Sequence, residues 1–232
     1  MKKKLLLILL LNTIIVLSQI NISSDITNRY IYRGTNVGGN SFHIQPSIKY
    51  NTNLDSLSTI QLSLWGTFGL DNKYKEVDFG GKYSIHNISF IVSVNYNPFD
   101  KYNNKIINPF TNEFILSYDG CTKFPFTFTI ESYFYGNDKN YGYNKNLDKN
   151  NSLYHSTYIE VGYFKIIGIN QFNIFTGFTP WSGMFSNKPS FVNIGITDNT
   201  KIKILNKNLP IYDTILFNPS TNKMFFLIGI TI

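Results

Sequence analysis

The chain has 232 residues, of which 16% are aromatic and only 15% are charged. The 20 Phe and 16 Tyr are typical of strands and membrane interfaces, and they argue against a helical protein rich in Ala, Leu, Glu and Lys. A mean hydropathy of -0.11 argues against a multi-helix membrane protein. It agrees with an all-β barrel, because the two faces of each strand alternate and the apolar face disappears from an average.

The N-terminal segment has the layout of a secretory signal peptide, because lysines at positions 2–4 precede an apolar run over 5–17. Two polar residues interrupt that run, and it is short for a spanning helix of about 20 residues, so a single membrane anchor is the weaker alternative. We expect residues 1–19 to be cleaved and residues 20–232 to form one barrel domain. Without the leader the chain keeps 18 basic and 14 acidic residues, and a net charge of +4 is too weak to indicate a nucleic-acid partner.

The first predicted strand covers 22–33. Its polar face carries Asp25, Arg29 and Arg33, and the opposite face carries the apolar and aromatic residues Ile22, Ile26, Tyr30 and Tyr32. Polar residues inward and apolar residues outward are expected of a membrane barrel. A glycine-rich turn at 34–40 leads to a second strand at 41–50, where Pro46 predicts a local irregularity because proline cannot donate to a ladder.

Period-2 alternation of apolar and polar residues predicts ten more strands. These are 59–70, 76–85, 88–96, 112–118, 124–133, 153–163, 171–179, 191–204, 209–217 and 224–232. Alternation leaves the sidedness of 171–179 and 209–217 open. The last strand has every second residue apolar from Met224 to Ile232 and needs a partner for its edge, which the first strand supplies if the sheet closes. The sequence therefore predicts an all-β, antiparallel, up-and-down transmembrane barrel of about twelve strands.

The connections between these strands sort by length. Long ones fall at 97–111, 136–151 and 180–190, and the connections that alternate with them are mostly short. Long loops outside and short turns inside are the rule for bacterial barrels, although 71–74 and 218–223 are short where long loops are expected. We expect the 180–190 loop, which contains Trp181 and Phe185, to fold onto the barrel mouth.

Three stretches resemble the TorF-type family of porins, an outer-membrane barrel family of poorly known function. They are SDITNRYIYRG at 24–34, LPIY at 209–212, and NP followed by FFLIGI within 218–230. The resemblance spans most of the mature chain and implies an outer-membrane porin of a Gram-negative bacterium without established catalytic residues. The chain departs from the common aromatic ending of such barrels, because its last residue is Ile232.

The function we predict is a porin or narrow channel for small solutes or ions. A barrel of about twelve strands is narrower than the 16–18 strands that leave an open channel, so loops and side chains fill part of its lumen. Charged residues of both signs are expected to line it and to set ion selectivity: Asp25, Arg29, Arg33, Lys49, Asp78, Lys82, Glu131 and Glu160. The alternative is that these charges pair with one another and only satisfy a wet interior.

Three further alternatives stay open. A membrane-embedded enzyme would need a nucleophile beside a base, but His155 and Ser156 are strand neighbours that point to opposite faces. We therefore expect no enzyme, no cofactor and no metal site, and the single Cys121 reads as a turn residue. A structural or ligand-binding barrel would use the long loops, and a secreted β-sandwich would bury the apolar faces. The expected partners are outer-membrane lipids, the barrel-assembly machinery through the C-terminal strand, and small polar solutes.

Overall fold

A computed structural model describes residues 19–98, 101–102, 105–106, 109–138 and 153–232. The predicted signal peptide and the tip of the 136–151 connection fall outside these residues. The strands are β1 (Ile20–Thr27), β2 (Ile31–Tyr32), β3 (Thr35–Asn36), β4 (His43–Asn53), β5 (Ser58–Gly69), β6 (Lys75–Ile85), β7 (Ile88–Tyr96), β8 (Lys101–Tyr102), β9 (Lys105–Ile106), β10 (Phe110–Tyr118), β11 (Phe126–Gly136), β12 (Thr157–Ile167), β13 (Asn170–Thr179), β14 (Ser190–Ile204), β15 (Lys207–Asn218) and β16 (Lys223–Thr231). None of the described residues belongs to a helix long and apolar enough to cross a membrane, a finding that concerns helices alone.

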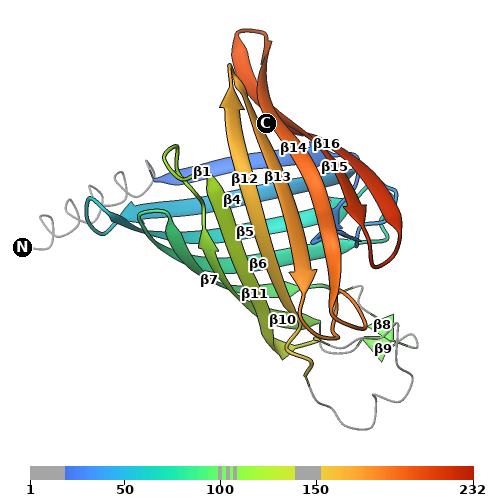
Figure 1. Ribbon diagram of the computed structural model, residues 1–232. Coiled ribbons are helices and arrows are strands. Elements are labelled where there is room, and N and C mark those ends of the chain that lie inside the picture. The colour runs from blue at the N-terminus through green and yellow to red at the C-terminus, as the bar shows by residue number, and fades with distance from the viewer. Residues whose placement is uncertain (1–18, 99–100, 103–104, 107–108, 139–152) are drawn as a thin grey trace, which may run out of the picture.

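Twelve of the described strands form one closed antiparallel barrel, in the order β1-β16-β15-β14-β13-β12-β11-β10-β7-β6-β5-β4 (Figure 1). The closing seam pairs Asp25 with Thr231 and Thr27 with Gly229, so the C-terminal strand meets the first strand as predicted. The two-sheet sandwich is therefore wrong and the barrel is confirmed. Strands β2 and β3, and β8 and β9, form two short hairpins outside the barrel ladder.

The two faces of each strand have different surroundings. On β16, Phe226 points outward and is 50% exposed, whereas its neighbour Phe225 points inward and is 8% exposed. The same alternation gives the barrel an apolar outer surface whose middle is mostly aliphatic: Ile48, Leu62, Leu64, Val92, Ile130 and Ile196 are all exposed. Exposed aromatic residues lie near several strand ends, as in the ring contacts between Tyr96 and Phe110 and between Phe124 and Phe126, and a few lie in mid-strand, such as Phe79 and Phe114.

The barrel has two unlike ends. The chain enters β1 at one of them, which also holds the short turns after β4, β6, β10, β12 and β14, and we call it the turn end. The other, the loop end, is where β1, β7, β11 and β13 finish and their long connections begin, and it also holds two short turns, at 70–74 and 219–222. In Figure 1 the hairpin of β8 and β9 lies at the loop end, at the lower right. Short turns at one end and long connections at the other match the predicted arrangement.

The pairing of neighbouring strands shows which residues of β13 and β15 point outward, a question that alternation in the sequence leaves open. On β13 the outward residues include Phe172 and Ile174, and on β15 Ile211 and Ile215 point outward. Pro46 interrupts the ladder as predicted, but the pairing of β4 with β5 keeps one register on both sides of it. Period-2 alternation along 191–204 puts Val192 on the same face as the outward Ile194 and Ile196, but a bulge on β14 opposite Gly177 and Phe178 turns Val192 inward, where it is fully buried.

The first strand is shorter than predicted, because β1 ends at Thr27 instead of continuing to Arg33. The Asn28 amide ends it: its Nδ2 donates to the Phe226 carbonyl at 3.1 Å, and its Oδ1 accepts from the Ile228 amide at 3.1 Å. A side chain thus takes the place of the backbone ladder, and the chain is free to turn. Residues 28–42 fold into the barrel, so the outward placement of Tyr30 and Tyr32 was wrong.

Candidate functional site

The connection of residues 28–42, here called the inward loop, crosses the barrel interior. It leaves β1, and β11 is the sixth strand from β1 in either direction, so the two strands lie on opposite sides of the barrel. Arg33 nevertheless reaches β11, with its Nε 2.8 Å from Oε2 of Glu131. Its guanidinium also lies 4.7 Å from the ring centre of Tyr158 on β12. The loop therefore spans the lumen and is fixed at the far wall.

The tip of the inward loop depends on a glycine. Gly34 has φ +80°, and a Cβ atom there would lie 1.9 Å from the Val192 carbonyl oxygen, so only glycine lets the loop seat against β14. The Gly34 carbonyl accepts a hydrogen bond at 2.9 Å from the Asn218 amide on β15. Next to it, the Tyr32 hydroxyl donates to Glu113 of β10 at 3.1 Å. The tip is thus held by three separate parts of the wall.

The near side of the inward loop packs against aromatic side chains. Tyr30 contacts His43, Trp65 and Tyr74, with ring centres 5.6–5.9 Å apart. His43 is fully buried and bonds through its two ring nitrogens to Thr67 Oγ1 and the Gly38 carbonyl. Burial, reinforced by the Glu76 carboxylate, raises the pKa of the Tyr30 hydroxyl well above its ordinary value, so this hydroxyl stays protonated and able to donate.

A second connection, at the loop end, packs against the inward loop. Phe185, in the 180–189 connection, packs on Tyr133 and Tyr158 with ring centres 6.1 and 5.6 Å apart. These residues form a buried cluster with Val192, and Tyr32 packs against it. The prediction that this connection folds onto the mouth is confirmed, and the apolar cluster lies inside the barrel beneath it.

Carboxylates outnumber cations around the inward loop. Five carboxyl side chains point into the lumen: Glu76 and Asp78 on β6, Glu113 on β10, Glu131 on β11 and Glu160 on β12. Arg33 is the partner in the one ion pair that the described residues form with them. Oδ1 of Asp78 and Oε1 of Glu131 are buried without a hydrogen-bond partner. This excess of carboxyl groups over cations offers oxygen atoms that suit a small cation.

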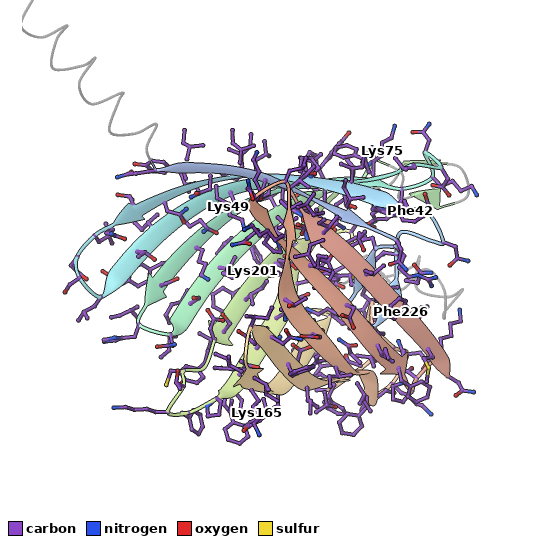
Figure 2. The ribbon with its side chains drawn as sticks, turned by 90° about the horizontal axis from the view of Figure 1, so that it is seen from above. Phe42, Lys49, Lys75, Lys165, Lys201 and Phe226 are labelled. Atoms are coloured by element: carbon purple, nitrogen blue, oxygen red, sulfur yellow. The ribbon has the colours of Figure 1, made fainter. Side chains whose placement is uncertain are left out.

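The eight residues predicted to line a pore do not form one group. Four of them come together around the inward loop: Arg33, Asp78, Glu131 and Glu160. Arg29 lies in the loop itself, and its Nε is buried without a hydrogen-bond partner. Asp25 accepts from Thr231 Oγ1 at 2.6 Å and belongs to the barrel seam. Lys49 and Lys82 lie on the inner face nearer the turn end, and Lys82 is 3.8 Å from Asp119. Figure 2 shows Lys49 inside the wall and Lys165 outside it.

Burial divides the lumen into two halves. Near the loop end the inward side chains are almost all buried, including Gln45, Thr67, Glu113 and Asn193. Toward the turn end they are half-buried or exposed, as Gln61, Ser63 and Lys49 show. A cavity of about 320 Å³ lies beside the inward loop, and its wall includes Tyr30, Tyr32, Tyr74, Glu76, Asn95 and Tyr133. The interior is therefore closely packed at the inward loop and more exposed toward the turn end, and it is hollowed beside the loop by this cavity, here called the vestibule.

Ser156 and His155 do not form a catalytic pair. The Ser156 hydroxyl donates to Asp138 and accepts from the Met184 amide at 2.7 Å, while His155 Nδ1 lies 3.3 Å from the Tyr133 carbonyl. Burial raises the pKa of Asp138, and two hydrogen bonds from Ser156 oppose that shift. Ser156 is fully buried, so these bonds join the 137–156 and 180–189 connections and leave no hydroxyl for a substrate. Among the described residues, no group of three His, Cys, Asp or Glu could hold a metal ion.

Sequence reasoning missed part of this site. Tyr30 and Tyr32 continue the alternation of β1, so nothing in the pattern shows that the chain has left the sheet. Glu76 lies at the loop end of β6. The inward direction of Glu113 is hard to recognise in the sequence, because two residues near it face the side that does not match their polarity: Asn112 points outward and Ile115 points inward. Glu113 could have been found by counting back from Phe114, whose exposed ring marks the outward positions.

These features define a class of protein. A closed antiparallel barrel satisfies all its ladder hydrogen bonds. An apolar outer belt with exposed aromatic side chains, enclosing a charged interior, is the architecture of a membrane-spanning β-barrel. The sequence matches no protein-family model and no curated protein.

Among solved structures the chain is similar to two bacterial outer-membrane proteins. One is a triple mutant of the Rhodopseudomonas blastica porin, with 10% identity and a TM-score of 0.39 over 82% of this chain and 55% of the porin, so the chain spans about half the porin's length. The other is the COG4313 outer membrane channel from Pseudomonas putida F1, with 12% identity and a TM-score of 0.49 over 91% of this chain and 92% of that one. Both likenesses are too distant to decide the function, which rests on the geometry of this chain.

Proposed function

We propose that this protein is a narrow outer-membrane channel for small cations and small polar solutes, with the inward loop as its constriction. The observation that carries the proposal is the bridge between Arg33 and Glu131, which fastens the inward loop to the wall opposite its origin. A loop held across a charged lumen reduces the passage, together with the buried cluster of Tyr133, Tyr158, Phe185 and Val192 that packs against it. The resemblance to TorF-type porins agrees with this proposal.

The chemistry of the passage indicates its solutes. Carboxyl oxygen atoms at the inward loop favour cations over anions, since Asp78 and Glu131 each keep one buried oxygen without a hydrogen-bond partner. The tyrosines of the vestibule offer hydroxyl donors and ring faces, because burial raises the pKa of the Tyr74 hydroxyl as it does that of Tyr30. Such a lining suits hydrated monovalent cations and small hydroxylated or amine-bearing solutes.

The outer surface suits a bilayer. We propose insertion in the outer membrane with the turn end in the periplasm, following export by the N-terminal leader and insertion by the barrel-assembly machinery, which would read the C-terminal strand. The apolar belt supports this, as does the sorting of short turns and long connections to opposite ends. Passive conduction accounts for the same residues without assigning any of them to catalysis.

Two neighbouring lysine substitutions test which face meets lipid. Ile130 points outward near the middle of β11 and is exposed, whereas Thr129 points inward and pairs with Glu160. We expect Ile130→Lys to lower the free energy of unfolding in vesicles by about 2–4 kcal/mol, and Thr129→Lys to change it by less than about 1 kcal/mol. Urea titrations followed by tryptophan fluorescence measure both. Equal losses would contradict a lipid-facing belt.

Planar-bilayer recordings under a KCl gradient test the proposal itself. Wild-type protein should carry a small ohmic current whose reversal potential shows a preference for K⁺. The Asp78→Asn, Glu113→Gln double variant should lower that preference, because it replaces two lumen carboxyl groups with amides and keeps an acceptor for Tyr32. Asp55→Asn, in a turn outside the lumen, is the matched control and should leave it unchanged. A folded barrel without current, or with a preference for Cl⁻, would refute the proposal.

A further inference from the structure

One row of the sheet carries charges on the outer face. Across four neighbouring ladders Lys165 pairs with Phe172, Phe172 with Asp198, Asp198 with Asp213, and Asp213 with Ile228. Paired residues point to the same side of a sheet. Ile228 is exposed on the outer surface, so the two aspartates and the lysine also point outward, away from the lumen. Figure 2 places Lys165 on the outside of the barrel.

The aspartates lie at the middle of the apolar belt. The outward residues of β15 run Phe217, Ile215, Asp213, Ile211, Leu209 and Lys207 from the loop end, so Asp213 is the third of six. Its partner Ile228 has the same central place among the outward residues of β16: Met224, Phe226, Ile228, Ile230 and Ile232. On the opposite wall the corresponding outward residues are apolar, as Leu62 and Leu64 on β5 show. One side of the barrel therefore presents carboxylates where lipid tails would lie.

The chain itself satisfies these carboxylates only in part. Oδ2 of Asp198 accepts a hydrogen bond at 2.9 Å from the Asn170 amide, but its Oδ1 is buried without a partner. The ion pairs formed within the described part of the chain lie elsewhere, at Arg33, Lys73 and Lys82. Asp213 and Asp198 stand directly opposite each other, and like charges in that position destabilise a sheet. Hydrocarbon offers no compensation, so this surface needs a partner with a cation at the same depth.

We propose that this face, formed by β12 to β15, binds a second copy of the chain in a twofold-symmetric dimer within the membrane. The same row supplies the missing cation, because Lys165 is exposed and lies two strands from Asp198. A twofold axis near Phe172 exchanges the two sides of the row and brings Lys165 of each copy opposite the partner's Asp198, one strand away from the partner's Asp213. An isologous contact of this kind is self-complementary in charge. The inference goes beyond conduction, which each barrel would perform alone.

Charge exchange tests the dimer. Dimerisation is measured by energy transfer between labelled proteins in vesicles over a range of protein-to-lipid ratios. Lys165→Glu and the Asp198→Lys, Asp213→Lys variant should each weaken dimerisation by at least about tenfold, because like charges then face each other. The triple variant that combines them should restore it. Heat-modifiable migration on gels shows that each barrel has folded, and current per barrel should not change.

Cross-linking gives an independent readout with native charges. In a Cys121→Ser background, Phe172→Cys places a thiol near the twofold axis and should form a dimer upon oxidation in vesicles. Phe79→Cys is the matched control, because Phe79 is an exposed outward residue on β6, away from the β12–β15 face. The proposal is overturned if the wild type stays monomeric, if the triple variant stays as weak as its parents, or if both thiols cross-link equally. None of these results would alter the outcome of the conductance test.

Discussion

Replacing Arg33 with alanine should lower the free energy of unfolding by about 3–5 kcal/mol and release the inward loop from the far wall. Glu131 has no exposed surface, and its other carboxylate oxygen has no hydrogen-bond partner, so loss of Arg33 leaves a buried charge uncompensated. Urea unfolding in vesicles measures the stability change. Single-channel recordings should show larger and noisier currents, because the loop then moves within the lumen.

Two controls separate this effect from simple loss of an ion pair. Lys82→Ala removes a partly exposed pair at the turn end and should cost less than about 1 kcal/mol, because water screens such pairs. The Arg33→Met, Glu131→Leu double variant removes both buried charges and should recover most of the lost stability. If Arg33→Ala were no more costly than Lys82→Ala, Arg33 would not fasten the loop.

Replacing Gly177 with valine should destabilise the barrel by about 3 kcal/mol or more. A Cβ atom at Gly177 would lie 2.1 Å from the hydroxyl oxygen of Tyr158 and 2.4 Å from the nearest ring carbon. Tyr158 cannot move away, because it is fully buried and bonds to Glu160 and Asn193. Denaturant titration in vesicles measures the loss, and the Arg33 contact with the Tyr158 ring should weaken with it.

Gly81 provides the matched control. It lies on β6 with its Cβ position facing outward, where the nearest side-chain atom, on Leu62, is 4.0 Å away. Gly81→Val should be neutral or slightly stabilising, because valine favours strands and the site has room. Comparable losses at the two glycines would mean that strand conformation, not the packing of Tyr158 in the lumen, sets the cost.

The strand framework could be predicted from the sequence because each wall position is decided locally. A residue that meets lipid and a neighbour that meets the lumen differ in polarity, so Met224 to Ile232 reveal their faces without any tertiary information. The pattern gives the wrong face where a polar residue lies on the outer surface or an apolar residue lies on the inner surface. Asp198 and Asp213 are acidic residues on the outer face, and Ile115 is an apolar residue on the inner face.

The constriction could not be predicted in the same way. Whether 28–33 continues as a strand depends on the Asn28 side chain meeting β16, some 200 residues later in the chain. The sequence predicts that Arg33 points inward, but it does not show which of several inward carboxylates pairs with Arg33. Only closure of the barrel places β11 opposite β1 and so decides between them.

The central claim is that the inward loop narrows a conducting barrel, and the most direct test is the single-channel conductance of a variant in which residues 31–36 are replaced by Gly-Ser-Gly. That change removes Arg33 and the hairpin of β2 and β3 while leaving every barrel strand intact. We expect a small conductance from the wild type and roughly threefold or more from the folded variant, because the narrowest part of the passage is gone. Equal conductance from the two proteins, with heat-modifiable migration showing that both barrels had folded, would contradict the account.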